Sequence, residues 1–315
     1  MTAQVGPEPA RRTRPRQTLQ VPVPAGFSWR GTLYSHGWAD LPPFRLDHET
    51  GTLHRVLLLD GRAVSLTMTC TAGAAIAARA DTPLTRISAR RAEAQIRRML
   101  GLDEDLSAFY AAAGAMAGYE WTPAAGAGRL LRSPTVFEDL VRVLCTTNCS
   151  WALTKQMVGR LIEHAGEPSS GGVHAFPSPE ALAERPERFF RERIRAGYRS
   201  GALRTLARDV AAGRRDVEGW AGSGLPLPEL KKEILSIRGI GPYAAENMLR
   251  LLGRHEGPAL DSWCRREFSE RHGKGRPVSD RAILRHYAGF GSWLGLALWC
   301  DLTRPWLEAD GSEPW

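Results

Sequence analysis

Residues 227–261 read LPELKKEILSIRGIGPYAAENMLRLLGRHEGPALD, two apolar helical patterns separated by a short glycine-containing turn. Before the turn, Leu230, Ile234 and Ile237 recur at helical spacing. After it, four more apolar residues recur at the same spacing: Ala245, Met248, Leu249 and Leu252. This stretch predicts two helices joined by a tight hairpin at 238–242.

Each residue of the turn suits such a hairpin. Gly239 can take the positive φ that a tight turn needs, and Gly241 lets the backbone approach a ligand closely. Pro242 fits the first position of the second helix, and Ile240 can anchor the hairpin in the core. Free N–H groups at a helix N-terminus suit a phosphate. A purely structural hairpin has the same pattern, so the turn alone leaves phosphate binding open.

Composition limits the classes of protein. The chain has 315 residues, 43% hydrophobic and 24% charged, as in soluble globular proteins long enough for two domains. It has no apolar run near the roughly 18 residues of a membrane span, and its start lacks the apolar stretch of a secretory signal. The five cysteines are dispersed and lack the paired spacing of a zinc or iron–sulfur site. We therefore expect a reducing, cytoplasmic setting and no metal.

The net charge of +8 favours a polyanionic partner, nucleic acid first. Only four of the 42 basic residues are lysines, which leaves 42 − 4 = 38 arginines. This bias is also typical of a GC-rich source, so charge alone leaves nucleic-acid binding open.

The pattern along the chain predicts an α+β protein. Residues 1–18 are a basic, Pro-rich tail that we expect to be flexible. Residues 19–125 have strand-like alternation on both sides of Asp60-Gly61, a strong hairpin signal, and predict a small antiparallel β domain with a helix near 87–101. Residues 126–315 predict an all-helical region.

The hairpin and the aspartate after it resemble the helix–hairpin–helix motif of the HhH-GPD superfamily of DNA glycosylases. Asp261 follows Gly241 by 261 − 241 = 20 positions. Similar segments lie on both sides, so the resemblance covers roughly residues 130–303. It is strongest to the branch of 8-oxoguanine and 3-methyladenine II glycosylases. In that branch a TATA-binding-protein-like β domain precedes the helices, as expected here.

The resemblance implies that Asp261 is catalytic. A carboxylate beside the sugar stabilises the oxocarbenium-like transition state of glycosidic cleavage. Asp261 also suits an N-cap for a helix that begins at Ser262, and the two roles are compatible.

Tyr243 stands where bifunctional members carry the lysine that forms a Schiff base with the sugar. The resemblance therefore implies a monofunctional DNA N-glycosylase of base excision repair, which flips a damaged base, alkylated or oxidised, and hydrolyses its N-glycosidic bond. Two alternatives stay open: a catalytically silent protein that binds damaged DNA, and a bifunctional glycosylase/lyase that uses Lys231 or Lys232.

The resemblance also implies binding residues. Gly239, Ile240 and Gly241 would hold the phosphate backbone. The base pocket or the wedge that fills the vacated gap would use four residues: Asn148, Tyr243, Asn247 and Trp299. We also expect His36, Gly37 and Trp38 to reach the cleft.

One position differs from the 8-oxoguanine enzymes, and two further tryptophans are not expected in the base pocket. Gly295 stands where those enzymes place a glutamine that reads the base edge, which argues against a simple transfer of the 8-oxoguanine specificity to this chain. Trp293 and Trp306 are expected in the core.

For partners and cofactors, the resemblance implies double-stranded DNA with damaged bases, a monomer at the bacterial nucleoid, and no membrane. It implies no cofactor beyond a monovalent cation at the hairpin carbonyls. The iron–sulfur loop of endonuclease III relatives is missing, since only Cys300 follows Cys264.

Overall fold

The computed structural model describes residues 17–71 and 74–308. Residues 1–16 of the expected tail lie outside this range, and Thr18 already begins the first strand. No helix in the described part of the chain is long and apolar enough to cross a membrane.

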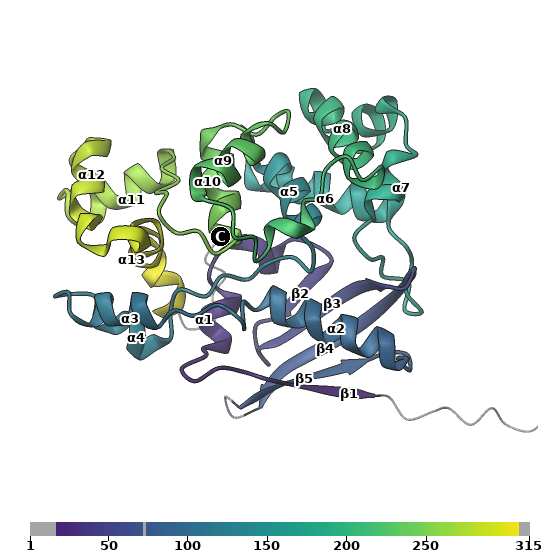
Figure 1. The fold of residues 1–315 in the computed structure, drawn as a ribbon, viewed down its shortest axis with the longest axis horizontal. Coiled ribbons are helices and arrows are strands. Elements are labelled where there is room, and N and C mark those ends of the chain that lie inside the picture. Colours follow the sequence, from purple (N-terminus) through teal and green to yellow (C-terminus); the bar gives the residue numbers. More distant parts are fainter. Residues whose placement is uncertain (1–16, 72–73, 309–315) are drawn as a thin grey trace, which may run out of the picture.

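A five-stranded antiparallel sheet forms one side of the molecule (Figure 1). Its order is β1-β5-β4-β3-β2, and its strands are β1 (Thr18–Pro22), β2 (Phe44–Asp47), β3 (Thr52–Leu59), β4 (Arg62–Thr71) and β5 (Ala75–Ala80). Asp60 and Gly61, with φ of 52° and 74°, make the turn between β3 and β4. Two consecutive positive φ values are what a two-residue hairpin needs, so the Asp-Gly signal is confirmed.

Helices cover the rest of the molecule. Those before residue 150 are α1 (Trp29–Leu33), α2 (Arg86–Met99), α3 (Ser107–Gly114), α4 (Trp121–Ala125) and α5 (Val136–Thr146). Those after it are α6 (Trp151–Ala165), α7 (Pro179–Ala183), α8 (Ser200–Ala211), α9 (Leu227–Leu235), α10 (Pro242–Leu251), α11 (Ser262–His272), α12 (Asp280–Tyr287) and α13 (Leu294–Glu308). The predicted α+β class is confirmed.

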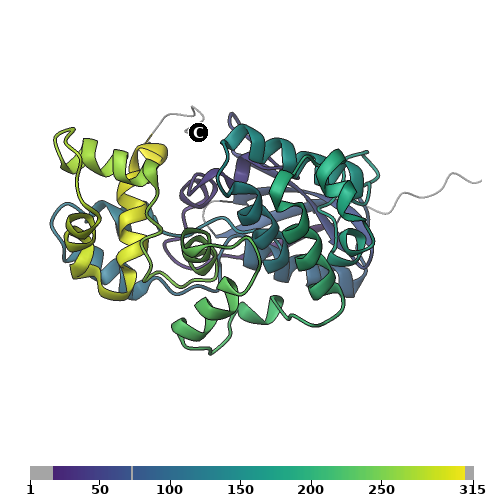
Figure 2. The same ribbon diagram turned by 90° about the horizontal axis from the view of Figure 1, so that it is seen from above.

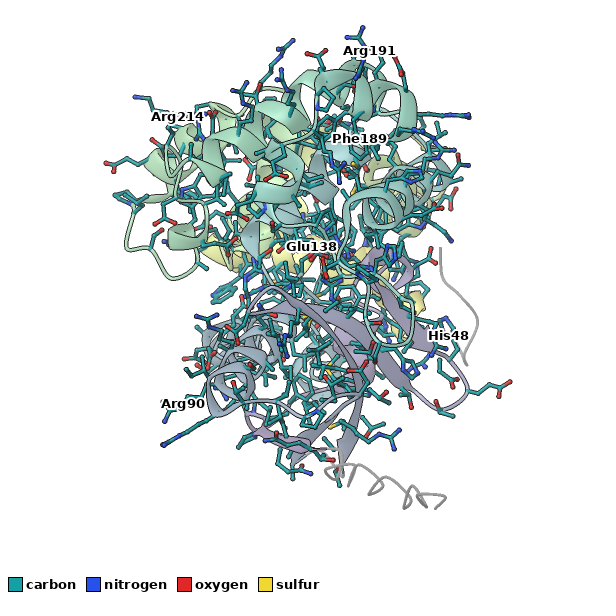
Figure 3. All side chains as sticks on the ribbon, turned by 90° about the vertical axis from the view of Figure 1, so that its right-hand side faces the viewer. His48, Arg90, Glu138, Phe189, Arg191 and Arg214 are labelled. Atoms are coloured by element: carbon teal, nitrogen blue, oxygen red, sulfur yellow. The ribbon has the colours of Figure 1, made fainter. Side chains whose placement is uncertain are left out.

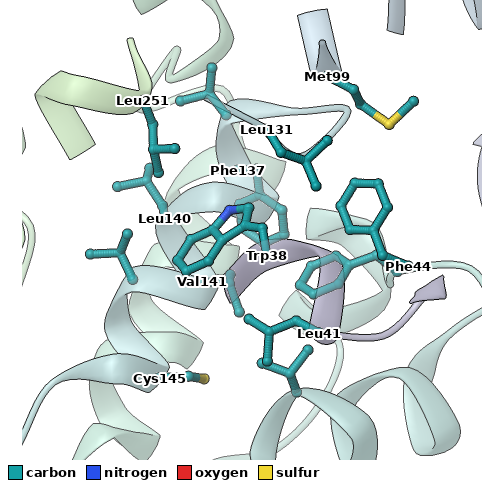
Figure 4. Packing of buried hydrophobic residues seen from close by; sticks show 14 of the residues in the cluster. Trp38, Leu41, Phe44, Met99, Leu131, Phe137, Leu140, Val141, Cys145 and Leu251 are labelled. Carbon is teal, nitrogen blue, oxygen red and sulfur yellow. The ribbon is translucent and has the colours of Figure 1, made fainter. Parts of the chain in front are cut away.

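Two hydrophobic clusters organise these elements. One joins the sheet to α2, α5, α6 and α8–α10, and Figure 4 shows Trp38, Phe44 and Leu140 packed within it. The other joins α3 and α4 to α11–α13, which lie together at one end in Figures 1 and 2. The division into domains at residue 125 stays a prediction, and the packing crosses it in both clusters.

A buried ion network fixes the sheet to α5. Glu138 accepts hydrogen bonds from Nη2 of Arg55 on β3 at 2.5 Å and from Nη2 of Arg142 at 2.6 Å. All three side chains are at most 3% exposed. Figure 3 shows Glu138 between the sheet and the helices. Two cations share one carboxylate here, so neither guanidinium is left without a counter-charge.

Glu138→Ala should lower the free energy of unfolding by about 3–5 kcal/mol, because it leaves two buried guanidinium groups without their counter-ion. Urea unfolding measures this loss. The control is Glu187→Ala, which breaks an exposed pair with Arg191 and should cost at most about 1 kcal/mol. Equal losses in the two variants would contradict the role given to the network.

Candidate active site

A cavity of about 740 Å³ opens where the sheet side of the molecule meets α10, α11 and α13. Its size lies within the roughly 300–1,000 Å³ of small-molecule pockets. Five tryptophans line it: Trp38, Trp151, Trp263, Trp299 and Trp306. The polar and charged side chains in its wall include His36, Tyr243, Asn247, Arg250, Asp261 and Arg266. A flat aromatic ligand with polar edges fits such a lining.

Asp261 caps a helix and also lies in the cavity wall. Its Oδ1 accepts a hydrogen bond from the Cys264 N–H at 2.7 Å and so caps α11. Its Oδ2 accepts one from the Tyr243 hydroxyl at 2.9 Å, and the residue lines the cavity. The cap fixes the side chain at the start of a helix, which holds the carboxylate in place beside whatever occupies the cavity.

Tyr243 lies in the first turn of α10 and is 40% exposed. Burial raises the pKa of its hydroxyl, and the charge of Asp261 raises it further. The phenol therefore stays protonated at neutral pH and donates its hydrogen bond to Asp261. It cannot form an imine.

The hairpin between α9 and α10 has the expected backbone. Gly239 has φ of +89°, and a Cβ there would lie 3.1 Å from Leu144 Cδ2. Ile240 is buried, whereas Gly241 is exposed and is the N-cap of α10. No described residue accepts a hydrogen bond from the N–H of either glycine. These free donors at a helix N-terminus suit an anion.

The segment from His36 to Trp38 forms part of the wall, and all three of its residues line the cavity. A Cβ on Gly37 would lie 2.5 Å from the ring of Trp151, so only glycine permits this contact. Trp38 donates from its indole N–H to Asp139 on α5 at 2.9 Å. The sheet side of the molecule thus contributes directly to the site.

The remaining predicted tryptophans differ in position. Trp299 is partly buried, lines the cavity and donates its indole N–H to the Ser35 carbonyl at 2.8 Å. Trp306 was expected in the core, and this expectation is wrong. Its side chain lines the cavity and packs against the ring of Trp263. Trp293 is outside the cavity lining and stacks on His255.

The two predicted asparagines are not equivalent. Asn247 lines the cavity one turn after Tyr243, and its amide donates to the Tyr243 carbonyl at 3.0 Å. Asn148 lies in the exposed loop between α5 and α6, with φ of 46°, and its amide donates to the Tyr198 hydroxyl at 3.3 Å. It is not among the cavity residues, although its neighbour Cys149 is. A wedge role for Asn148 stays a prediction.

Gly295 is closed to any larger side chain. A Cβ there would lie 1.9 Å from the carbonyl oxygen of Gly257, and the Gly295 N–H donates to the His255 carbonyl at 2.7 Å. The backbone of 255–257 packs directly on α13 at this point. A glutamine could not occupy this position without moving that segment.

Besides Trp306, sequence reasoning missed four aromatic or charged residues of the wall: Trp151, Arg250, Trp263 and Arg266. A signal for Arg250 was present, because Tyr243, Asn247 and Arg250 are spaced i, i+4, i+7 and share one face of α10. The others come from separate segments, which only the tertiary structure brings together.

None of the four lysines lines the cavity. Lys231 pairs with Glu246 across the α9–α10 pair, and Lys155 pairs with Asp40 at 3.0 Å. Lys232 is exposed on α9. Neither lysine proposed for an alternative lyase reaches the wall that holds Asp261.

One cluster outside the cavity has the composition of a metal site. Ligand atoms of His272, His286 and Asp301 lie within 4.8 Å of one another. Oδ2 of Asp301 already lies 2.6 Å from both the Tyr287 hydroxyl, which donates to it, and His272 Nε2. This network of hydrogen bonds explains the cluster without a metal.

His36 is a buried histidine in the cavity wall. Burial lowers its pKa to about 4; the charge of Asp139 opposes this, and those of Arg250 and Arg142 add to it. Nε2 lies 2.7 Å from the Leu131 carbonyl, so it carries the proton and donates to that oxygen. The ring is neutral at neutral pH.

The stability of the chain should therefore fall as pH drops from about 6.5 to about 4. In this window His36 is protonated in the unfolded chain and neutral in the folded chain. This difference lowers the free energy of unfolding by up to about 3 kcal/mol. His36→Gln keeps a hydrogen-bond donor for the Leu131 carbonyl. It should remove this part of the slope of the free energy of unfolding against pH, which urea unfolding at several pH values measures. The control is His164→Gln at an exposed position of α6. An unchanged slope in His36→Gln would contradict the assignment.

No family model and no curated protein sequence matches the chain. Solved structures do resemble it. A 3-methyladenine DNA glycosylase from Archaeoglobus fulgidus is 19% identical, with a TM-score of 0.70 over 91% of this chain and 98% of that one. An 8-oxoguanine glycosylase/lyase from Clostridium acetobutylicum in its apo form is 18% identical, with a TM-score of 0.66 over 88% and 93%. Its complex with double-stranded DNA containing cytosine opposite 8-oxoguanine also has a TM-score of 0.66, at 18% identity over 89% and 91%. The chain therefore has the fold of the helix–hairpin–helix DNA glycosylases.

Proposed function

We propose that this chain is a monofunctional DNA N-glycosylase of base excision repair. It flips a damaged base, alkylated or oxidised, out of double-stranded DNA and hydrolyses its N-glycosidic bond. The observation that carries the proposal is the position of Asp261. Its carboxylate is fixed by the helix cap and lies in the wall of an aromatic cavity. It also accepts a hydrogen bond from Tyr243, the second residue of α10, the helix that follows the hairpin. The fold supports the same proposal.

In the proposed reaction the bond between C1′ of deoxyribose and the base nitrogen breaks. Positive charge develops on the sugar, and the Asp261 carboxylate stabilises it. Water supplies the oxygen that bonds to C1′, and one water proton ends on the released base. Tyr243 keeps the carboxylate oriented through its 2.9 Å hydrogen bond and supplies no nucleophile.

The DNA backbone would be held at the hairpin. The free N–H groups of Gly239 and Gly241 meet a phosphate at the N-terminus of α10, where the helix dipole favours negative charge. A Cβ at Gly241 would meet no other protein atom within 4 Å, so its surroundings are open to a ligand. Arg266, exposed at the cavity, adds positive charge nearby.

The extruded base would occupy the aromatic cavity. Extrusion costs a few kcal/mol and is easiest for damaged or mispaired bases. Stacking on a tryptophan such as Trp299 recovers about 1–3 kcal/mol per base. The size and lining of the cavity accommodate a purine.

The alternatives are less well supported. A silent binding protein does not require a fixed carboxylate in the cavity wall. A lyase requires a neutral amine near C1′, and Lys231 instead pairs with Glu246 away from the cavity. The proposed enzyme acts as a monomer at the nucleoid in the cytoplasm, with no cofactor beyond a monovalent cation at the hairpin carbonyls.

Asp261→Asn should abolish base release and leave duplex affinity within severalfold, because the hairpin rather than the carboxylate holds the phosphate. Asparagine caps a helix about as well as aspartate, so stability should change by less than about 1 kcal/mol. Single-turnover release from duplexes that each carry one lesion, scored after hot alkali, measures the effect. Near-normal release by a folded Asp261→Asn variant would refute the catalytic role. A wild-type protein that binds duplex yet releases no base would favour the silent binder.

The product should be an intact strand with an abasic site, which breaks only after alkali. Borohydride added during turnover should trap no covalent complex, because Tyr243 cannot form an imine. The matched variant is Lys231→Met with Lys232→Met. A trapped band in the wild type that disappears in this double variant would overturn the monofunctional proposal and leave glycosylase activity standing.

A further inference from the structure

Arg250 is a buried cation in the cavity wall, and none of the described residues forms an ion pair with it. It is 3% exposed, and no described carboxylate lies within ion-pair distance of it. Glu246, one turn earlier on α10, bonds Lys231 instead. By contrast, the buried Arg55 and Arg142 both pair with Glu138.

Arg129 and Arg199 are also buried without an ion pair, but each donates to two oxygen atoms, those of Gly101 and Glu104 for Arg129 and two of Thr147 for Arg199. Arg250 has only one such acceptor among the described residues. A buried charge costs several kcal/mol unless it is compensated, so Arg250 calls for an explanation.

The hydrogen bonds of Arg250 are incomplete. Its Nη2 donates to the Pro258 carbonyl at 3.2 Å, which fixes the guanidinium. Its Nε is fully buried and has no acceptor, and no described group accepts from Nη1. Nη1 is not fully buried, so it is the donor that a ligand in the cavity can reach. An unpartnered donor of a fixed guanidinium beside a cavity suits a ligand with an acceptor atom.

The same guanidinium occupies a face of Trp299. Its central carbon lies 4.8 Å from the centroid of the indole ring. Because Arg250 already makes a cation–π contact with this face of the ring, a cationic base cannot make that contact there. The positive charge of Arg250 would also repel a cationic base directly.

We infer that Arg250 determines specificity by donating hydrogen bonds to a carbonyl edge of an uncharged extruded base, and that it disfavours cationic alkylated bases. The inference rests on the proposed function, because it names the class of base which that cavity accepts. Hypoxanthine and 8-oxoguanine belong to this class, whereas 7-methylguanine carries a positive charge while it is bonded to deoxyribose. Arginine is the usual partner of a purine carbonyl edge elsewhere in DNA recognition. Gly295 is closed by the 255–257 backbone, so no longer side chain reads the base from there.

The test compares base release from three duplexes, containing hypoxanthine, 8-oxoguanine or 7-methylguanine, each divided by its uncatalysed rate. The wild type should accelerate release of at least one uncharged base more than that of 7-methylguanine. Arg250→Met should reduce the ratio of uncharged to cationic release about 10- to 100-fold, the usual discrimination of one good arginine contact. Arg250→Lys keeps the charge but loses the planar donors, and should give an intermediate ratio.

The matched control is Arg254→Met. Arg254 also donates to backbone carbonyls, at 2.9 Å to Ser223 and 3.1 Å to Leu225, but lies outside the cavity. It should leave the ratio unchanged. Thermal melting shows which variants are folded. If Arg250→Met does not fold, the ratio of uncharged to cationic release by Arg250→Lys decides the test.

The outcomes separate the inference from the proposed function. Equal losses on all three duplexes would make Arg250 a packing residue and overturn the inference. A wild-type protein that prefers 7-methylguanine would also overturn it, while leaving the glycosylase proposal intact. A wild-type protein that releases no base from any lesion duplex would contradict the proposed function and the inference together.

Discussion

The carboxylates of Glu138 and Asp139, adjacent and buried on α5, set the geometry of the site. Glu138 binds Arg55 from β3, and Asp139 accepts hydrogen bonds from the Trp38 indole and from Arg98 on α2, each at 2.9 Å. Trp38 is at once part of this network and part of the cavity wall. Two adjacent carboxylates of α5 therefore act together: Glu138 binds the sheet through Arg55, and Asp139 holds Trp38 in the cavity wall.

The hairpin was predictable from sequence because its determinants are local. The apolar spacing of α9 and α10, the positive φ of Gly239 and the proline at the start of α10 act within a few residues of one another. The Asp60-Gly61 turn was predictable for the same reason. A left-handed backbone is costly for most residues, so a glycine in a tight turn carries much information.

The cavity wall was less predictable because it is assembled from distant segments. Trp306 shows the limit: a tryptophan on an amphipathic helix can face a core or a cavity, and its spacing is the same in both cases. For Asp261 the sequence allowed two roles, and the geometry reconciles them because different oxygens of one carboxylate serve the cap and the Tyr243 bond. The interest of Arg250 depends on a fact that no sequence pattern contains: no carboxylate within residues 17–71 and 74–308 pairs with it.

The pairing of α3 and α4 with α11–α13 has a consequence for synthesis of the protein. Phe109 on α3 packs against Phe290 and Trp293, about 180 residues further along the chain. During translation, α3 and α4 leave the ribosome long before the segment that covers their apolar side has been made. Closing so long a loop is slow, so this end of the molecule should be the last to order. Asp261 caps α11, one of the late helices, so the site would be completed only when the C-terminal helices have docked.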